Sequence, residues 1–176
     1  MSSMHIIPTK RDAYILQMEY SNNENMEYFK QHIDKKLGPM SHRTNVKGEM
    51  TDYGAFLKDS TFSDFIGEFF IPEINKYQQL FPPEQNIGGK MNLREAWGNK
   101  LEKGHQVVQH IHPSQWSSVL YFCDSSPLET EAGAFKTSKG KIITISGWLP
   151  HWVRPVDKER YSLVWNWNLI MEKNRE

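Results

Sequence analysis

The sequence predicts an α+β fold that is mainly β, in which N-terminal helices pack on one sheet of a jelly roll. Two observations lead to this prediction. From Met91 onward, short apolar or alternating runs are separated by turn residues, at the spacing expected of an antiparallel sandwich or barrel. Upstream of Met91, apolar residues recur at helical spacing instead. A helical layer packed on a jelly-roll sheet is the simplest architecture that combines both patterns.

The chain is expected to form a single domain over residues 1–176. This length is enough to bury one core without disulfides or a structural metal. We divide it into a mixed helical and strand support region at 1–90 and a β core at 91–170. Because folding needs no metal, any metal-ligand pattern in the chain points to function more than to stability.

The N-terminal region is expected to supply one strand and two helices. Residues 14–20 alternate enough to form a strand, and Asn23 can cap a first helix that stops at Gly38-Pro39. A second helix follows cap residues at 59–61, and Pro72 kinks or restarts it. Its aromatic stripe is assigned to the core and consists of Phe62, Phe65, Ile66, Phe69 and Phe70.

The second half is expected to form six strands and one short extended piece. The strands lie near 93–101, 105–112, 117–123, 132–137, 140–146 and 160–169, and the extended piece lies at 151–153. Turns are expected at Lys103-Gly104, at Ser125 to Pro127 and at Lys139-Gly140. The lone cysteine, Cys123, is interpreted as a small buried thiol in a strand.

Charge and composition narrow the range of partners. Lys plus Arg and Asp plus Glu both number 21, and no long basic run is present, so no nucleic-acid partner is expected. The sequence shows no signal peptide and no long apolar stretch, which predicts a cytoplasmic protein without a membrane partner. The oligomeric state is left open.

His110 and His112 are the first candidates for metal ligands. They are two residues apart in a strand-like run, so both imidazoles leave the same face with Cα atoms about 7 Å apart. The strand ends at Pro113, which places the pair at a sheet terminus. Two histidines at this spacing are, taken alone, more often surface or satisfied core residues, so the pair by itself is a weak signal.

A distal segment strengthens the interpretation. His151 lies in Pro150-His151-Trp152-Val153, and Arg160 and Ser162 follow as an Arg-x-Ser pair at the start of a strand. This order resembles the double-stranded β-helix Fe(II)/2-oxoglutarate oxygenases, whose usual signature is His-x-Asp/Glu, a later His, and Arg-x-Ser. The sequence around these motifs resembles that of a small, partly phage-associated, prolyl-hydroxylase-like group of proteins with a His-x-His-Pro motif. The resemblance covers about residues 91–170, which are expected to form the double-stranded β-helix core.

The resemblance implies a site and a reaction. His110, His112 and His151 would hold Fe(II), because three protein ligands on one octahedral face leave positions for a 2-oxo acid and O2. Arg160 would bind the distal carboxylate of the cosubstrate 2-oxoglutarate through its planar fork, with Ser162 and Tyr121 as further donors. The implied activity is hydroxylation of a C–H bond with release of succinate and CO2.

Several alternatives stay open. His112 stands where the commonest form of the signature has a carboxylate, and three-histidine sites also occur in cupin-like enzymes that use no 2-oxo acid. A non-catalytic jelly-roll binding module is a second alternative. Arg160 could instead form a surface ion pair with Glu159 or Asp157. The substrate could be a small molecule or a protein side chain.

The remaining histidines and three tryptophans receive simpler assignments. His105 is expected on the opposite strand face from the candidate ligands, and His5, His32 and His42 are interpreted as surface residues. The tryptophans either line the mouth of the barrel or pack in its walls as core residues. They are Trp116, Trp148 and Trp152.

Overall fold

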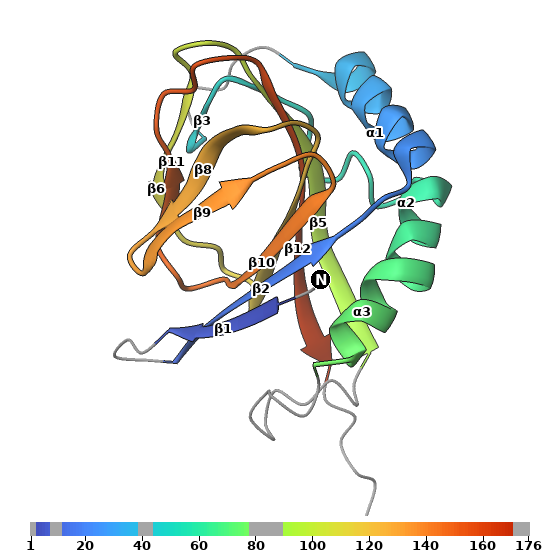
Figure 1. The fold of residues 1–176 in the computed structure, drawn as a ribbon. Coiled ribbons are helices and arrows are strands. Elements are labelled where there is room, and N and C mark those ends of the chain that lie inside the picture. The colour runs from blue at the N-terminus through green and yellow to red at the C-terminus, as the bar shows by residue number, and fades with distance from the viewer. Residues whose placement is uncertain (1–2, 8–11, 39–43, 78–89, 171–176) are drawn as a thin grey trace, which may run out of the picture.

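The computed structural model of the protein describes residues 3–7, 12–38, 44–77 and 90–170, without the side chains of 4–7, 90 and 170 (Figure 1). Its described strands form two sheets in which every pairing is antiparallel. Seven strands make the larger sheet, in the order β1 (Ser3–Ile7), β2 (Ala13–Glu19), β10 (Lys141–Ser146), β7 (Trp116–Tyr121), β12 (Arg160–Ile170), β5 (Lys90–Leu101), β4 (Glu49–Met50). Five make the smaller sheet, in the order β3 (Val46–Lys47), β6 (Gln106–His110), β11 (His151–Val153), β8 (Ser125–Thr130), β9 (Gly133–Thr137). The predicted jelly roll is confirmed.

The helices form where their caps and apolar spacing predict. Helix α1 (Asn23–Lys36) is capped by Asn22, one residue earlier than predicted, whose side chain accepts a hydrogen bond from the Asn25 amide. Asp59 caps α2 (Ser60–Asp64), which continues as a π-helical segment η1 (Phe65–Phe70) and then α3 (Ile71–Asn75). Pro72 lies in the first turn of α3, directly after the π-helical segment, so the helix continues past the proline.

The helices cover the larger sheet on the side away from the smaller one (Figure 1). Their aromatic stripe packs edge-on against β12, with the ring of Phe70 4.9 Å from that of Trp165. Trp116 belongs to the same core, since it stacks on Trp167 at 5.6 Å, so its alternative assignment as a core residue is correct. Helices packed on one sheet are therefore confirmed.

Strand β12 separates the two cores of the molecule. Its odd-numbered residues, including Leu163 and Trp165, face the helices, whereas Val164 packs in a second core between the sheets. Arg160 and Ser162 share the inner face with Val164 and line a cavity there. The period-2 alternation of one strand thus supplies both the helix-side core and part of the cavity wall.

Three local predictions are wrong. Residues 125–130 form β8 and not a turn, because the chain already bends at 122–124. Pro127 is tolerated in β8 since the pairing with β9 shifts register between Ser125 and Leu128. Cys123 lies in the bend after β7, half-buried, with its thiol donating to the carbonyl of Glu159. Strand β6 ends at His110, so His112 lies beyond it.

The described helices are also informative about membranes. No helix in the described ranges is both long enough and apolar enough to span a bilayer.

Candidate metal centre

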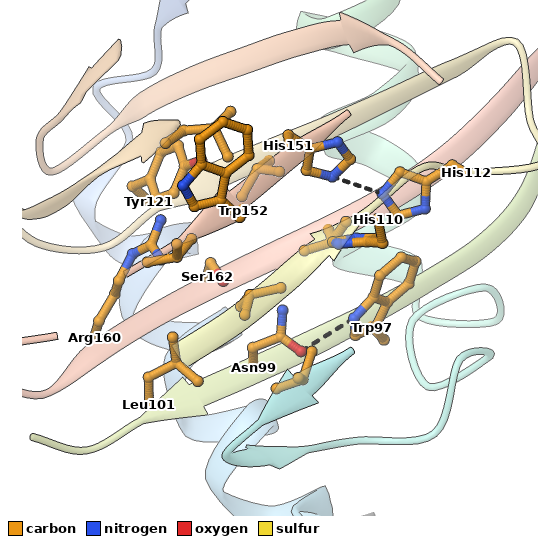
Figure 2. Close-up of a pocket in the computed structure, with 16 residues that line it drawn as sticks. Trp97, Asn99, Leu101, His110, His112, Tyr121, His151, Trp152, Arg160 and Ser162 are labelled. Carbon is orange, nitrogen blue, oxygen red and sulfur yellow. Dashed lines mark hydrogen bonds between the residues drawn. The ribbon is translucent and has the colours of Figure 1, made fainter. Parts of the chain in front are cut away.

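Strand pairing brings two of the candidate ligands together. His110 ends β6 and His151 begins β11, and the two residues are direct partners across the smaller sheet (Figure 2). His112 follows β6 in a segment whose backbone amide donates to the Gly147 carbonyl at 2.8 Å. A Cβ at Gly147 would meet the Ser114 carbonyl oxygen at 1.9 Å, so only glycine allows this close approach.

The three imidazoles converge on one point. One ligand atom from each of His110, His112 and His151 lies within 4.8 Å of the others, and His112 Nε2 is 3.2 Å from His151 Nε2. Two nitrogens bound to one ion at about 2.1 Å and at right angles would stand about 3.0 Å apart. The observed separation is close to that value. Imidazole nitrogen is a common ligand of iron, zinc, copper and nickel, so this donor set fits a divalent transition metal.

Backbone carbonyls orient two of the rings. His110 Nδ1 donates to the Val108 carbonyl and His151 Nδ1 donates to the Leu149 carbonyl, both at 2.8 Å. A neutral imidazole with its proton on Nδ1 presents its lone pair at Nε2. Each carbonyl therefore fixes both the ring orientation and the nitrogen that is free to bind a metal.

The third ring is held by a side-chain relay. Asn166 Nδ2 donates to His112 Nδ1 at 3.2 Å and to Glu95 Oε2 at 2.8 Å, while Asn166 Oδ1 is buried without a partner. Because His112 Nδ1 accepts in this arrangement, its Nε2 carries the proton and donates to His151 Nε2, and this proton must leave Nε2 when a metal binds there. Asn166 thus orients the ring of the third candidate ligand.

Electrostatics keep all three rings neutral near pH 7. Burial, followed by the charges of His151 and His110, lowers the pKa of His112 to about 2. Burial and then the charge of His110 lower the pKa of His151 to about 4, and burial also lowers the pKa of His110. Neutral rings keep their lone pairs, which metal binding needs.

The opposite end of the same cavity holds a buried cation (Figure 2). The Arg160 side chain is 3% exposed, its Cζ lies 5.0 Å from the centre of the Tyr121 ring, and its Nε has no hydrogen-bond partner. No carboxylate among the described residues forms an ion pair with it, and Glu159 pairs with Lys100 instead. The surface ion-pair alternative is therefore wrong, because the guanidinium turns inward.

Tyr121 and Ser162 complete this end of the cavity. The Tyr121 hydroxyl is buried without a hydrogen-bond partner, and burial raises its pKa to about 12, so it remains a donor. Ser162 is buried two residues after Arg160 on the same strand face. A cation and two hydroxyls around one cavity, with two of their donors unused, form a cradle for an anion.

Comparisons with known proteins address the fold. No protein-family model matches the sequence, and no curated protein matches it. Solved structures do match. A viral collagen prolyl hydroxylase from Paramecium Bursaria Chlorella virus-1, in its 2OG complex, is similar with a TM-score of 0.65 at 11% identity, over 87% of this chain and 94% of that one. The chain has the fold of the 2OG-Fe(II) oxygenases.

Two further structures show the same oxygenase fold. A Pseudomonas putida prolyl-4-hydroxylase is similar with a TM-score of 0.64 at 16% identity, over 89% of this chain and 93% of that one. A 2OG-Fe(II) oxygenase family oxidoreductase from Burkholderia pseudomallei is similar with a TM-score of 0.61 at 15% identity, over 87% and 83% of the chains. The sequence resemblance and the oxygenase fold thus agree.

The structure also decides where the other tryptophans and histidines lie. Trp152 lines the cavity, and its indole donates to Glu129 at 3.0 Å, whereas Trp148 packs against the core between the sheets. His105 stays outside the cluster as predicted, since its Nδ1 accepts from the Glu102 amide. His32 is half-buried with its ring 4.8 Å from that of Phe56, so its surface assignment is wrong. His42 and the side chain of His5 lie outside the described residues.

Sequence reasoning missed the contribution of β5 to the candidate site. Glu95 holds the Asn166 relay, and Trp97 and Asn99 line the cavity, joined by a hydrogen bond of 3.1 Å. These residues are two apart along β5 and so share one face of the strand, which was the only sign in the sequence that they belong together. Their role depends on β5 pairing with β12, where Glu95 is opposite Asn166.

Proposed function

We propose that this protein is an Fe(II)- and 2-oxoglutarate-dependent oxygenase that hydroxylates a C–H bond and releases succinate and CO2. His110, His112 and His151 would hold the metal, and Arg160, Ser162 and Tyr121 would bind the distal carboxylate of 2-oxoglutarate. The observation that carries this proposal is the buried Arg160 guanidinium, which forms no ion pair with a described residue, in the same cavity as three convergent imidazoles. When bound, Fe(II) supplies the redox chemistry that activates O2.

The buried guanidinium favours an anionic cosubstrate. A buried charge without a counter-ion is costly, and a carboxylate that accepts bidentate hydrogen bonds from the guanidinium offsets that cost. Arg160 has a free Nε and Tyr121 has a free hydroxyl, so donors are available on two sides of the anion. The three-histidine enzyme without a 2-oxo acid and the binding module both leave this cradle without a role.

Charge at the histidine cluster favours the same ligand. Three neutral imidazoles leave a bound divalent ion with its full charge, whereas a carboxylate ligand would reduce that charge by one. The 2-oxoglutarate dianion cancels the remaining charge. Metal and cosubstrate therefore support each other's binding in this cavity.

The apolar lining serves to keep water out. Val119, Leu128, Val153 and Val164 line the cavity that contains the histidines and Arg160. A dry cavity strengthens the pairing of Arg160 with a carboxylate and protects a reactive centre from side reactions.

The test is succinate formation from 2-oxoglutarate under Fe(II) and O2, measured without added substrate and then with candidate substrates. The native chain is expected to form succinate, His151→Ala none, and Arg160→Ala only at much higher 2-oxoglutarate. Arg94→Ala is the matched control, because Arg94 is exposed. Unchanged 2-oxoglutarate dependence in Arg160→Ala, or no succinate from the native chain under any condition, contradicts the proposal.

A further inference from the structure

A second cavity opens directly beyond the histidines. Its lining residues include Tyr53, Glu95, Trp97, His110, Ile111 and His112. It shares Val46, Trp97, His110 and His112 with the cavity that contains Arg160. A molecule bound in the second cavity would therefore lie against the candidate metal ligands and away from Arg160, which does not line this cavity.

Glu95 gives this cavity its charge. Among the lining residues it is the one carboxylate, and none of them is a lysine or an arginine. Its Oε2 accepts a hydrogen bond from Asn166, which fixes the carboxylate, and Glu95 forms no ion pair with a described residue. The cavity thus contains a positioned negative charge without a counter-ion.

Two aromatic rings stand beside this carboxylate. Tyr53 is 45% exposed, and its ring lies edge-on to Trp97 at 5.1 Å. Burial and then the charge of Glu95 raise the pKa of Tyr53, so the phenol stays protonated in the field of the carboxylate. Aromatic faces next to a carboxylate attract a cation and repel an anion.

The rest of the wall is aliphatic. Ile111 is 57% exposed, an unusual degree for a large apolar side chain, and Val46 and Pro113 continue the apolar surface. An apolar strip beside a carboxylate and two rings matches a ligand with a methylene stem and a positively charged end.

We propose that this cavity binds an alkylammonium group, with the ammonium against Glu95, Tyr53 and Trp97 and the aliphatic stem against Ile111. The bound group is the substrate presented to the metal centre. That substrate role rests on the proposed function, whereas binding of the ammonium group does not. A lysine side chain and a free aliphatic amine share this chemistry.

The test measures binding and needs no turnover. The full chain loaded with Zn(II), without 2-oxoglutarate, is titrated calorimetrically with n-butylammonium, with Nα-acetyl-lysine methylamide and with the neutral Nα-acetyl-norleucine methylamide. Both ammonium probes are expected to bind, and the norleucine probe is expected to bind about tenfold more weakly than its lysine counterpart. If the lysine probe binds more tightly than n-butylammonium, the ligand is a protein side chain. If n-butylammonium binds more tightly, the ligand is a free amine.

Glu95→Gln is the decisive variant, because glutamine keeps an oxygen acceptor for Asn166 and loses only the charge. It should bind the ammonium probes about tenfold more weakly, whereas Glu131→Gln, at an exposed turn, should bind them as the native chain does. Tyr53→Leu, at a partly exposed position, should weaken binding about threefold, with folding checked by its melting temperature.

Two results overturn the inference: equal affinity for the lysine and norleucine probes, or native affinity for ammonium in Glu95→Gln. Failure of the oxygenase proposal is distinguishable from either. Absent succinate formation together with Glu95-dependent ammonium binding would remove the oxygenase and its substrate assignment and leave the ammonium site standing. Succinate formation without ammonium binding would remove the ammonium site and leave the oxygenase proposal standing.

Discussion

Replacing Arg160 by methionine is expected to have opposite effects on the ligand-free and ligand-bound protein. The native side chain is 3% exposed, its Nε has no partner, and no described carboxylate forms an ion pair with it. Methionine is similar in length and carries no charge. In the ligand-free protein, the substitution removes an uncompensated buried cation, so the free energy of unfolding should rise.

The size of the effect can be worked from the contacts. An unpaired buried polar group costs about 1–3 kcal/mol, and the loss of the guanidinium over the Tyr121 ring, at 5.0 Å, offsets about 0.5–1 kcal/mol of that. The net gain is about 0–2.5 kcal/mol, centred near about 1 kcal/mol. For a chain of 176 residues, each kcal/mol moves the melting temperature by about 2–4 °C, so Arg160→Met should melt higher by up to about 10 °C.

Binding of 2-oxoglutarate should change in the opposite direction. Two hydrogen bonds to a charged group contribute about 3–6 kcal/mol together, so their loss should weaken binding by about a hundredfold or more. Saturating 2-oxoglutarate at a hundred times its dissociation constant would stabilise the native chain by about 2.7 kcal/mol and the variant hardly at all. The order of the two melting temperatures should therefore reverse when Mn(II) and 2-oxoglutarate are added.

The assay is thermal and urea unfolding of both chains, with and without these ligands, beside calorimetric titration. Arg94→Met, at an exposed position, is the control and should stay within about 0.5 kcal/mol of the native chain in every condition. A ligand-free Arg160→Met chain that is less stable than the native one, or one that 2-oxoglutarate stabilises equally, would refute the reasoning.

The remaining predictions concern the histidines and their support. The affinity of the native chain for Mn(II) should rise about 5- to 150-fold when 2-oxoglutarate is present. The His112→Asp variant should bind Mn(II) alone more tightly and show a smaller coupling between Mn(II) and 2-oxoglutarate. Equal Mn(II) affinities of the native chain with and without 2-oxoglutarate would contradict a neutral third ligand. Asn166→Leu, which removes the partner of His112 Nδ1, should lower Zn(II) affinity about 10- to 100-fold in competition with a chelator, and an unchanged affinity would mean that the relay does not position the ring. Burial lowers the pKa of His151 to about 4 and of His112 to about 2, below the roughly 6.5 of the unfolded chain. Protons therefore favour the unfolded state below about pH 6.5. The metal-free chain should be most stable above that pH and should lose stability as the pH falls toward 4. A constant free energy of unfolding from pH 7 to pH 5 would contradict these pKa shifts.

Local patterns in the sequence were enough to predict the layers of the molecule and much of the candidate site. The aromatic stripe at 62–70 identified the helical layer because apolar residues at helical spacing form one face. The His-x-His pair, His151 and the Arg-x-Ser pair were recognised by type and order, and the structure brings all of them to one cavity. Period-2 alternation alone places Arg160 and Ser162 on one face of their strand.

Only the tertiary structure decided how these residues meet. The pairing of His110 with His151, the place of His112 beyond its strand, and the position of Glu95 opposite Asn166 all depend on registers between strands far apart in the chain. A register shift of one residue would turn each side chain to the other face, and local sequence does not specify which strands pair. The absence of a counter-ion for Arg160 among the described residues is likewise a property of the packed molecule, because burial and partners exist only after folding.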